Sequence, residues 1–443
     1  MRDFAVSDDP RVQAQLDRLA ALSLPQGRIG LDAVRALLDR LDNPQRALPP
    51  VFHVAGTNGK GSTCAFLRAM LEAAGKRVHV FTSPHLVRFN ERIRIAGQLI
   101  DDALLADLLA EVLDAAEADG ISASFFEIST AAAFLAFARV PADACVIEVG
   151  LGGRFDATNV LERPVACGVA TLGIDHEAFL LAPEEGVPAE PLSRIAFEKA
   201  GIAKSGAPLV THDYTPPMNA TIAQRAAQVG APLLRRGRDW WIGSHGDGMV
   251  YRDGSGETAL PAPHLPGVHQ ISNAGLAIAM LRAQDAVAVS DPALAEGIRG
   301  ARWPARMQRL GGGPITTLLP AGTPCWLDGG HNPDAGQALA RHFAESGARI
   351  HLVIGMLANK NPAALLEPLA PMLASVTTVP IPGHEAHDPS AFAEVAGIPR
   401  PNSAANVTEA LHGLNIQPGE IVVIAGSLYL AGVVLRLNRE LPD

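Results

Sequence analysis

Residues 51–62, VFHVAGTNGKGS, decide the fold of the first half of the chain. Val51–Ala55 reads as a buried strand, and after Ser62 apolar residues recur at helical spacing until Gly75. The glycine-rich turn between them lets consecutive backbone N–H groups point toward one centre, and the helix start adds partial positive charge. This order of strand, loop and helix therefore predicts a phosphate-binding turn, to which Lys60 would add a full charge.

The loop departs from the Walker pattern G-x-x-x-x-G-K-[ST], because Val54 holds the place of the first glycine and Gly61 follows the lysine. The alternative is a glycine-rich turn that binds nothing. Taken alone, the loop indicates a nucleotide site and no particular reaction.

Strands and helices alternate along the rest of the chain, which predicts an α/β protein with a mainly parallel sheet. The pattern restarts late, so we expect two domains, residues 1–298 and 299–443, joined near residues 297–309. Residues 182–191, APEEGVPAEP, are rich in Pro and Glu and read as an exposed loop. The other predicted strands are 77–81, 145–149, 165–172, 324–327, Ile350–Ile354, 376–380 and Ile421–Ala425, with helices around 131–137, 333–345, 363–373 and 407–414.

Composition excludes several classes of protein. A chain of 443 residues is too long for one ordinary core, and 48% hydrophobic with 19% charged residues is the balance of a globular protein. A net charge of −10 argues against a sequence-blind nucleic-acid binder. Four isolated cysteines suit a reducing compartment. No secretory signal is visible, and the apolar stretch 421–435 is shorter than the ~20 residues of a spanning helix, so we expect a cytoplasmic protein without a membrane partner.

Oxygen and nitrogen ligands follow three predicted strands at the edge where the phosphate loop lies. Ser83 and the pair Asp175-His176 come directly after strands, while Glu148 lies inside an apolar strand, which is costly unless the carboxylate is paired or ligated. Mg²⁺ prefers hard oxygen ligands, so His176 is the weaker candidate. The alternatives are that Glu148 only caps a loop and that His176 is a satisfied core residue.

Three further positions are candidate nucleotide contacts. Asn273 lies at a helix start, Arg306 lies in the junction segment, and Asp328 opens the run DGGHNP between a strand and a helix. The alternatives are a helix cap, a surface charge and an N-cap turn, and only the combination of the three favours function.

Together these motifs resemble the folylpolyglutamate synthase/dihydrofolate synthase family, whose members are related to the Mur ligases. The likeness runs in the family's order over nearly the whole chain. It covers residues 56–62, 82–92 (TSPHLVRFNER), 126–127, 148–159 (EVGLGGRFDATN), 175–176, 198–202 (EKAGI), 306–308, 328–333 and 426–429 (GSLY).

The resemblance implies an ATP-dependent ligase that joins a carboxylate to the amino group of L-glutamate. It also implies an N-terminal P-loop NTPase-like domain and a smaller C-terminal Rossmann-like domain, with ATP in the cleft between them. Carried over to this chain, the ATP phosphates are held by Asn58, Gly59, Lys60, Gly61 and Ser62. The nucleotide would be contacted from the other side by Asn273, Arg306 and Asp328.

The resemblance further implies two Mg²⁺ ions, one held by Ser83 and Glu148 and the second by His176. Lys199 matches a lysine that CO₂ converts to a carbamate, an anionic ligand where an ammonium would be repelled; the residues alone would have suggested a helix-surface lysine. A place for a monovalent cation is implied as well. Lys60, Lys199 and His331 take the catalytic roles.

By the same resemblance, the dihydropteroate pocket is bounded by Arg28, Ile29, Ser124, Phe125, Phe126, Glu127, Phe155, Asp156 and Ala157. Bacterial enzymes with a region like residues 124–127 often act on both dihydropteroate and folates. Two departures stand out: residues 177–179 and 182–191 are longer and more acidic than usual, and Ala305 replaces a glycine before Arg306.

The leading interpretation is a monomeric, bifunctional enzyme whose substrates are dihydropteroate, reduced folates and L-glutamate. A folylpolyglutamate synthase with one activity is the nearest alternative. A Mur-type ligase would place Thr where Gly61 stands. A nucleotide-binding regulator without turnover is disfavoured by the presence of Lys60, Glu148, His176, Lys199 and Arg306.

Overall fold

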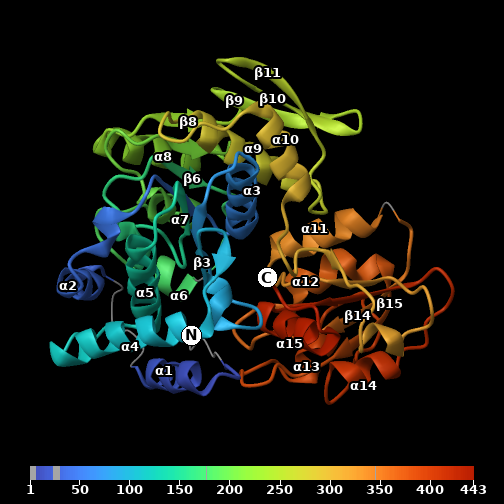
Figure 1. The fold of residues 1–443 in the computed structure, drawn as a ribbon. Helices are drawn as coiled ribbons and strands as arrows, with labels where there is room; N and C mark the ends of the chain where they lie inside the picture. Colours follow the sequence, from blue (N-terminus) through green and yellow to red (C-terminus); the bar gives the residue numbers. More distant parts are fainter. Residues whose placement is uncertain (1–5, 23–29, 176, 345) are drawn as a thin grey trace. The chain divides into compact units, whose positions relative to one another are not determined.

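The structure, a computed structural model, describes residues 6–22, 30–175, 177–344 and 346–443 (Figure 1). It divides into two compact units. Unit 1 comprises Met1–His264 and Gln270–Arg302, and unit 2 comprises Leu265–His269 and Trp303–Asp443. The last passage from unit 1 to unit 2 follows Arg302, and the sequence did not suggest that residues 265–269 belong to unit 2.

Unit 1 is built on a large, mostly parallel sheet in the order β4-β3-β2-β5-β1-β6-β7-β8. β3 and β4 are the antiparallel strands of this sheet. Because β1, β2, β5 and β6 run in the same direction, the loops that follow them gather at one edge. The strands are β1 (Val51–Ala55), β2 (Val78–Phe81), β3 (Ile93–Ile95), β4 (Gln98–Leu99), β5 (Ala144–Glu148), β6 (Ala166–Val169), β7 (Leu209–Thr211) and β8 (Leu233–Arg235).

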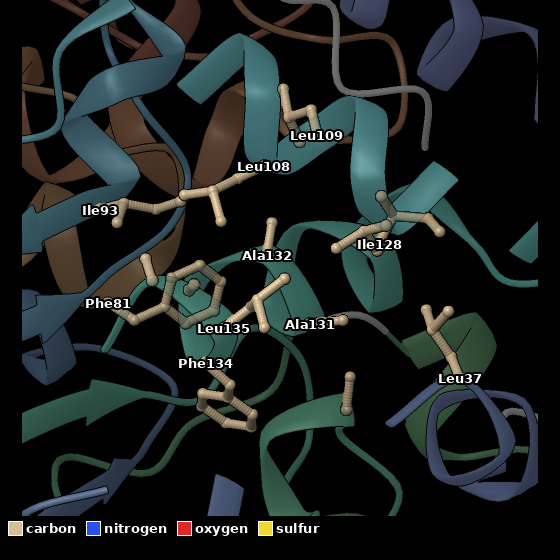
Figure 2. Packing of buried hydrophobic residues seen from close by; sticks show 14 of the residues in the cluster. Leu37, Phe81, Ile93, Leu108, Leu109, Ile128, Ala131, Ala132, Phe134 and Leu135 are labelled. Atoms are coloured by element: carbon tan, nitrogen blue, oxygen red, sulfur yellow. The ribbon is translucent and has the colours of Figure 1, made fainter. Parts of the chain in front are cut away.

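Helices cover both faces of this sheet. Residues 128–137 of α5 are all buried, as expected of a helix enclosed by other elements. Its side chains pack with those of α2, α4, β2 and β3 in the core that Figure 2 shows, and α1 lies along α4. The helices are α1 (Pro10–Ala21), α2 (Asp32–Arg40), α3 (Lys60–Ala73), α4 (Asp102–Ala118), α5 (Phe125–Arg139), α6 (Glu177–Leu180), α7 (Pro191–Ala200), α8 (Pro216–Val229), α9 (His269–Arg282) and α10 (Asp291–Gly300).

Two features of unit 1 differ from the predictions. The expected junction begins at Gly297, which instead lies inside α10, where a Cβ atom would clash with the backbone of Met70 in α3. This close approach binds α10 to unit 1. The antiparallel meander of β9 (Trp240–His245), β10 (Gly248–Asp253) and β11 (Gly256–Pro261) was not predicted, because its strands are too polar to read as buried runs.

Unit 2 contains a second sheet in the order β12-β13-β17-β14-β15-β16, parallel except for β12. Its strands are β12 (Gln308–Arg309), β13 (Cys325–Leu327), β14 (Ile350–Ile354), β15 (Leu373–Thr378), β16 (Asn402–Ser403) and β17 (Ile421–Ala425). Its helices are α11 (Pro333–Ala344), α12 (Pro362–Leu369), α13 (Pro389–Ala393), α14 (Val407–His412) and α15 (Leu428–Asn438). The prediction of an α/β chain whose first sheet is mostly parallel is confirmed.

Two predicted boundaries in unit 2, the end of one helix and the start of the next strand, are wrong. The helix expected over residues 363–373 ends at Leu369, and β15 begins at Leu373 rather than at residue 376. Pro368 and Pro371 explain the early end, because proline lacks the N–H group that a helix needs. Within the described residues, no helix has the length and apolarity to cross a membrane. All four cysteines are buried and free.

The side chain of His212 gives unit 1 a pH-dependent stability. Neither of its ring nitrogens has a hydrogen-bond partner among the described residues, and burial lowers its pKa to about 3, with repulsion from Arg236 adding to the effect. Below pH 6.5 the unfolded chain binds a proton at this histidine that the folded chain does not, so stability falls as the pH falls toward 3.

We expect His212→Phe to remove this effect. When the pH falls from 7.5 to 5, the unfolding free energy of the variant should fall by about 2 kcal/mol less than that of wild type. Each unit of pH below the pKa of the unfolded histidine is worth about 1.4 kcal/mol. Urea unfolding at the two pH values measures the difference. An equal pH dependence in both proteins would show that His212 is protonated in the folded state.

Candidate functional site

The phosphate loop lies between β1 and α3, as the sequence predicts. α3 begins at Lys60, and its N-cap, Gly59, has no side chain to accept a hydrogen bond from the first turn. The first helical N–H groups have no acceptor within the helix itself. They therefore form a positively polarised helix end that suits a phosphate group.

The other half of the loop is fastened to the strand beside it. The N–H groups of Thr57 and Asn58 both donate to the Thr171 carbonyl, at 2.8 and 3.2 Å, and the Thr57 hydroxyl donates to the Gly173 carbonyl at 2.8 Å. The backbone N–H of Asn58 thus helps to hold the loop against the residues that follow β6. Lys60 Nζ donates to the Gly56 carbonyl at 3.0 Å and so lies over the loop.

Asn273 lies against this loop, within unit 1. It is 2% exposed, and a Cβ atom on Gly59 would come within 2.5 Å of its Oδ1. Its amide also donates to Gln270 Oε1 at 2.9 Å. α9 thus places Asn273 in unit 1 beside the phosphate loop, whereas Arg306 and Asp328 belong to unit 2.

Gly59 is needed for two reasons, its φ of +81° and its contact with Asn273. We expect Gly59→Ala to weaken ATP binding about tenfold or more, because the methyl group must displace Asn273 or distort the helix start. A titration of ATP monitored by calorimetry measures the loss. Gly75→Ala is the matched control: Gly75 also has a positive φ, at +74°, but its Cβ position is open. Equal ATP affinity in the two variants would contradict this role of Gly59.

Glu148 ends β5 close to the start of α3. Its side chain is 4% exposed, and Oε2 accepts a hydrogen bond from the Ser83 N–H at 3.3 Å. Burial raises the pKa of Cys64, in α3, and the negative charge of Glu148 raises it further while Lys60 lowers it, so both charges lie near Cys64. A buried carboxylate beside a serine and a phosphate loop is a donor set that Mg²⁺ prefers.

No three His, Cys, Asp or Glu side chains gather into a metal site within the described ranges. This fits Mg²⁺, which is usually held by one or two carboxylates together with nucleotide phosphates rather than by a cage of protein ligands. His176, the expected ligand of a second ion, lies outside the described residues.

The segment after Ser83 is a turn held by Glu91. Its carboxylate accepts hydrogen bonds from the N–H groups of Leu86, Val87 and Arg88 at 2.7–2.9 Å. The adjacent Arg92 donates to His85 Nδ1 at 2.9 Å. These contacts tie residues 85–92 into one hydrogen-bonded turn. They give a physical reason for the motif that the sequence shows over residues 82–92.

The glycine-rich segment 150–153 packs directly on α7. A Cβ atom on Gly153 would come within 2.7 Å of the Glu198 carbonyl and 3.0 Å of Lys199 Cα. The Arg154 N–H donates to that carbonyl at 2.8 Å, and Gly201 abuts Arg154 in the same way. This backbone contact fixes the position of Lys199 relative to Glu148 at the end of β5.

Lys199 is 4% exposed, although the sequence reads as a helix-surface lysine. Burial, together with repulsion from Lys60, lowers its pKa to about 7 against the opposing charges of Asp175, Asp156 and Glu198. Lys199 therefore shares the electrostatic environment of the phosphate loop, and a large share of its amine is neutral near pH 7.

A network of four charged side chains surrounds this segment. Arg154 binds Glu184 at 3.0 Å and Glu198 at 2.7 Å, and Arg194 binds Glu184 at 2.7 Å. The side chains are only 6–16% exposed. The loop 182–191 is therefore not wholly exposed as predicted: Glu184 turns inward to neutralise two arginines.

The residues expected to bind dihydropteroate fall into three groups. Arg28 and Ile29 lie outside the described residues. Ser124 and Glu127 form the capping box of α5. In the third group, Phe126 contacts Gly150 and Phe81, and Phe125 contacts Phe89. Asp156 and Ala157 are buried. Phe155 lines a cavity described below.

The candidate nucleotide contacts of unit 2 lie in the turn after β13 and in the segment that precedes β12. Asp328 accepts hydrogen bonds from the Met307 and Gly330 N–H groups at 2.8 and 2.7 Å, so its carboxylate orders the turn after β13. Arg306 lies against Gly329, and His331 Nδ1 is 3.1 Å from the Gly329 carbonyl. Ala305, which replaces a glycine, has a left-handed φ of +55°.

Comparison with known proteins supplies the family. Residues 306–428 match the model of the Mur ligase glutamate ligase domain. The chain is 33% identical to a folylpolyglutamate synthase of Lacticaseibacillus casei, covering 90% of this chain and 92% of that protein. It is 36% identical to the dihydrofolate synthase/folylpolyglutamate synthase of Escherichia coli K12, covering 80% and 78%.

The chain belongs to the folylpolyglutamate synthase/dihydrofolate synthase family. Among solved structures, E. coli FolC in complex with DHPP and ADP superposes with a TM-score of 0.85 at 31% identity, over 98% of each chain. A bifunctional family member with Mn, AMPPNP and L-glutamate bound superposes with a TM-score of 0.83 at 30% identity, over 96% of this chain and 97% of that one. The resemblance drawn from the motifs is thereby confirmed, and the chain is an ATP-dependent glutamate ligase of this family.

Proposed function

We propose that this chain is bifunctional, adding L-glutamate to dihydropteroate and to the γ-carboxylate of reduced folates. The observation that carries the proposal is the convergence of the uncapped start of α3, the buried Glu148 and the buried Lys199 in one electrostatic environment. Support for two acceptors comes from the E. coli relative, whose name carries both activities, and from its complex with DHPP.

The chemistry proceeds in two displacements. An oxygen of the acceptor carboxylate attacks the γ-phosphorus of ATP. The bond between the γ-phosphorus and the β,γ-bridging oxygen breaks, ADP departs, and the acceptor becomes an acyl phosphate. The amine of glutamate then attacks the acyl carbon and releases inorganic phosphate, and the nitrogen loses its proton as the amide forms. The first turn of α3 and Lys60 would hold the phosphates, with Asn273 beside them.

Ser83 and Glu148 would hold Mg²⁺, which when bound neutralises phosphate charge and polarises the phosphorus–oxygen bonds. Arg306 and Asp328 remain proposed nucleotide contacts, and His331 a proposed catalytic residue. Five further proposals rest on membership of the family: a second Mg²⁺ at His176, a monovalent cation, a monomeric state, a cytoplasmic location, and a P-loop-like and a Rossmann-like domain.

Lys199 is proposed to react with CO₂ and to become a carbamate, a reaction in which the neutral amine forms an N–C bond and loses a proton. Its burial supports this step, because it favours the neutral amine, and its place beside Lys60 gives the resulting anion a cation to face. Carbon-13 NMR of protein in labelled bicarbonate should show a carbamate signal that is absent in Lys199→Met. Identical spectra would contradict the modification.

The experiment that tests the two activities is phosphate release with ATP, Mg²⁺ and L-glutamate, once with dihydropteroate and once with tetrahydrofolate. We expect turnover with both acceptors and none without glutamate beyond a slow background. Turnover with tetrahydrofolate alone would leave a folylpolyglutamate synthase. Silence with both would contradict the function.

A further inference from the structure

A cavity of about 510 Å³ opens in unit 1 at the start of α2, beside the segments that follow α7 and β5 and near the end of α8. This volume lies within the range of small-molecule sites, roughly 300–1,000 Å³. Leu31, Phe155 and Val229 give it an apolar strip. Gly201, in its wall, follows Lys199 by two residues, so the cavity adjoins the segment that carries the proposed active-site lysine.

Three cations from three different segments also line this cavity: Arg35 in α2, Lys204 after α7 and Arg225 in α8. None of them forms an ion pair with a carboxylate of the described chain. Lys204 donates to the Asn159 carbonyl at 3.0 Å, and the buried Nε of Arg225 has no hydrogen-bond partner there. Burial lowers the pKa of Lys204, and repulsion from Arg225 and Arg35 lowers it further against the opposing charges of Cys167 and Glu162, so both guanidinium groups act on the Lys204 ammonium.

The other charged groups of the wall leave the balance positive. Asp32 is in the first turn of α2, where the helix dipole favours a carboxylate. The charge of Arg154 is already neutralised by Glu184 and Glu198, so Arg154 lines the cavity without adding net positive charge. The like charges of Arg35, Lys204 and Arg225 repel one another, with Glu162 as an opposing charge on Lys204, and a bound anion would lower the cost of that repulsion. In a chain of net charge −10, such a local excess of positive charge points to an anionic ligand.

We propose that this cavity binds the γ-linked glutamate tail of a folate, an inference that rests on the proposed function. Such a tail carries one carboxylate per residue, separated by two methylene groups and an amide. Three separate cations around an apolar strip match separated single charges joined by methylenes. A compact phosphate would need its donors converging on one point, as they do at the start of α3.

Calorimetric titration of the full-length protein with tri-γ-L-glutamate, which has no pteridine, tests the site. We expect binding that Arg35→Gln and Arg225→Gln each weaken about tenfold and that salt weakens further. Arg40→Gln is the matched control, since Arg40 lies in the same helix but pairs with Asp119 at 3.0 Å. Arg35 is exposed, so its replacement leaves the fold intact.

Binding that is absent, or equally strong in all variants, would overturn the proposal. Cavity-dependent binding of pyrophosphate without binding of the glutamate peptide would also overturn it, in favour of a phosphate ligand.

Kinetics separate this inference from the proposed function. Arg35→Gln/Arg225→Gln should raise KM for a triglutamyl folate about tenfold and leave kcat and KM for the monoglutamate within twofold. Equal KM changes for both acceptors would overturn the tail site while the ligase remains. Absence of ligation by wild type with every acceptor would overturn the proposed function, and the titration would then still decide whether the cavity binds a glutamate chain.

Discussion

Lys199→Met is expected to lower kcat about 1,000-fold while leaving the protein at least as stable as wild type. The loss of activity follows if Lys199, as the proposed carbamate, helps to stabilise the transition state at the γ-phosphate. Removing one stabilising group of this kind typically lowers kcat by about 100- to 1,000-fold. The unchanged stability follows from its burial: a 4% exposed amine is replaced by an apolar side chain of similar length.

The two readouts separate function from structure. Single-turnover phosphate release gives the rate, and urea unfolding gives the stability. Lys76→Met, a lysine that follows α3, is the matched control and should keep its activity within twofold. A variant that loses activity only because it unfolds would contradict the role assigned to Lys199, as would a variant with normal turnover.

Arg154→Met is expected to destabilise unit 1 by about 3 kcal/mol, the low end of the cost of breaking a buried ion pair. Removing this guanidinium leaves Glu184 and Glu198 with Arg194 alone, in side chains only 6–16% exposed. Although burial opposes it, the two carboxylates raise the pKa of Arg154, so the charge is present at any accessible pH.

The matched control is Arg46→Met, which breaks an exposed pair with Glu162 and should change stability by about 0.5 kcal/mol or less. Arg154→Met/Glu184→Gln should recover part of the loss, because the uncompensated charge is removed. Urea unfolding measures all three. Equal stability of Arg154→Met and Arg46→Met would show that the network carries no net energy.

Much of the fold follows from local pattern. The bounds of β1, β14 and β17 match the predicted ones, because all five residues of each strand are buried and the runs are mostly apolar. The phosphate loop follows for the same reason, since its strand, glycines and helix are contiguous in the chain. The positions of Ser83 and Glu148 follow from parallel strand order, which brings the ends of β2 and β5 together.

What could not be predicted depends on contacts between distant residues. Asn273 packs on Gly59 from far along the chain, and no local pattern shows that α9 reaches the phosphate loop. Glu184 reads as a loop carboxylate because its partners, Arg154 and Arg194, flank it at irregular spacing. Lys199 reads as a surface lysine, since its burial arises from the backbone of Gly153.

The most direct test of the central claim uses dihydropteroate labelled with ¹⁸O in its carboxylate, together with ATP, Mg²⁺ and L-glutamate. If the carboxylate attacks the γ-phosphate, one labelled oxygen per turnover must appear in the released inorganic phosphate, and mass spectrometry detects the shift. Amide formation with unlabelled phosphate would contradict the acyl-phosphate route, and labelled substrate recovered unchanged would contradict the ligase itself.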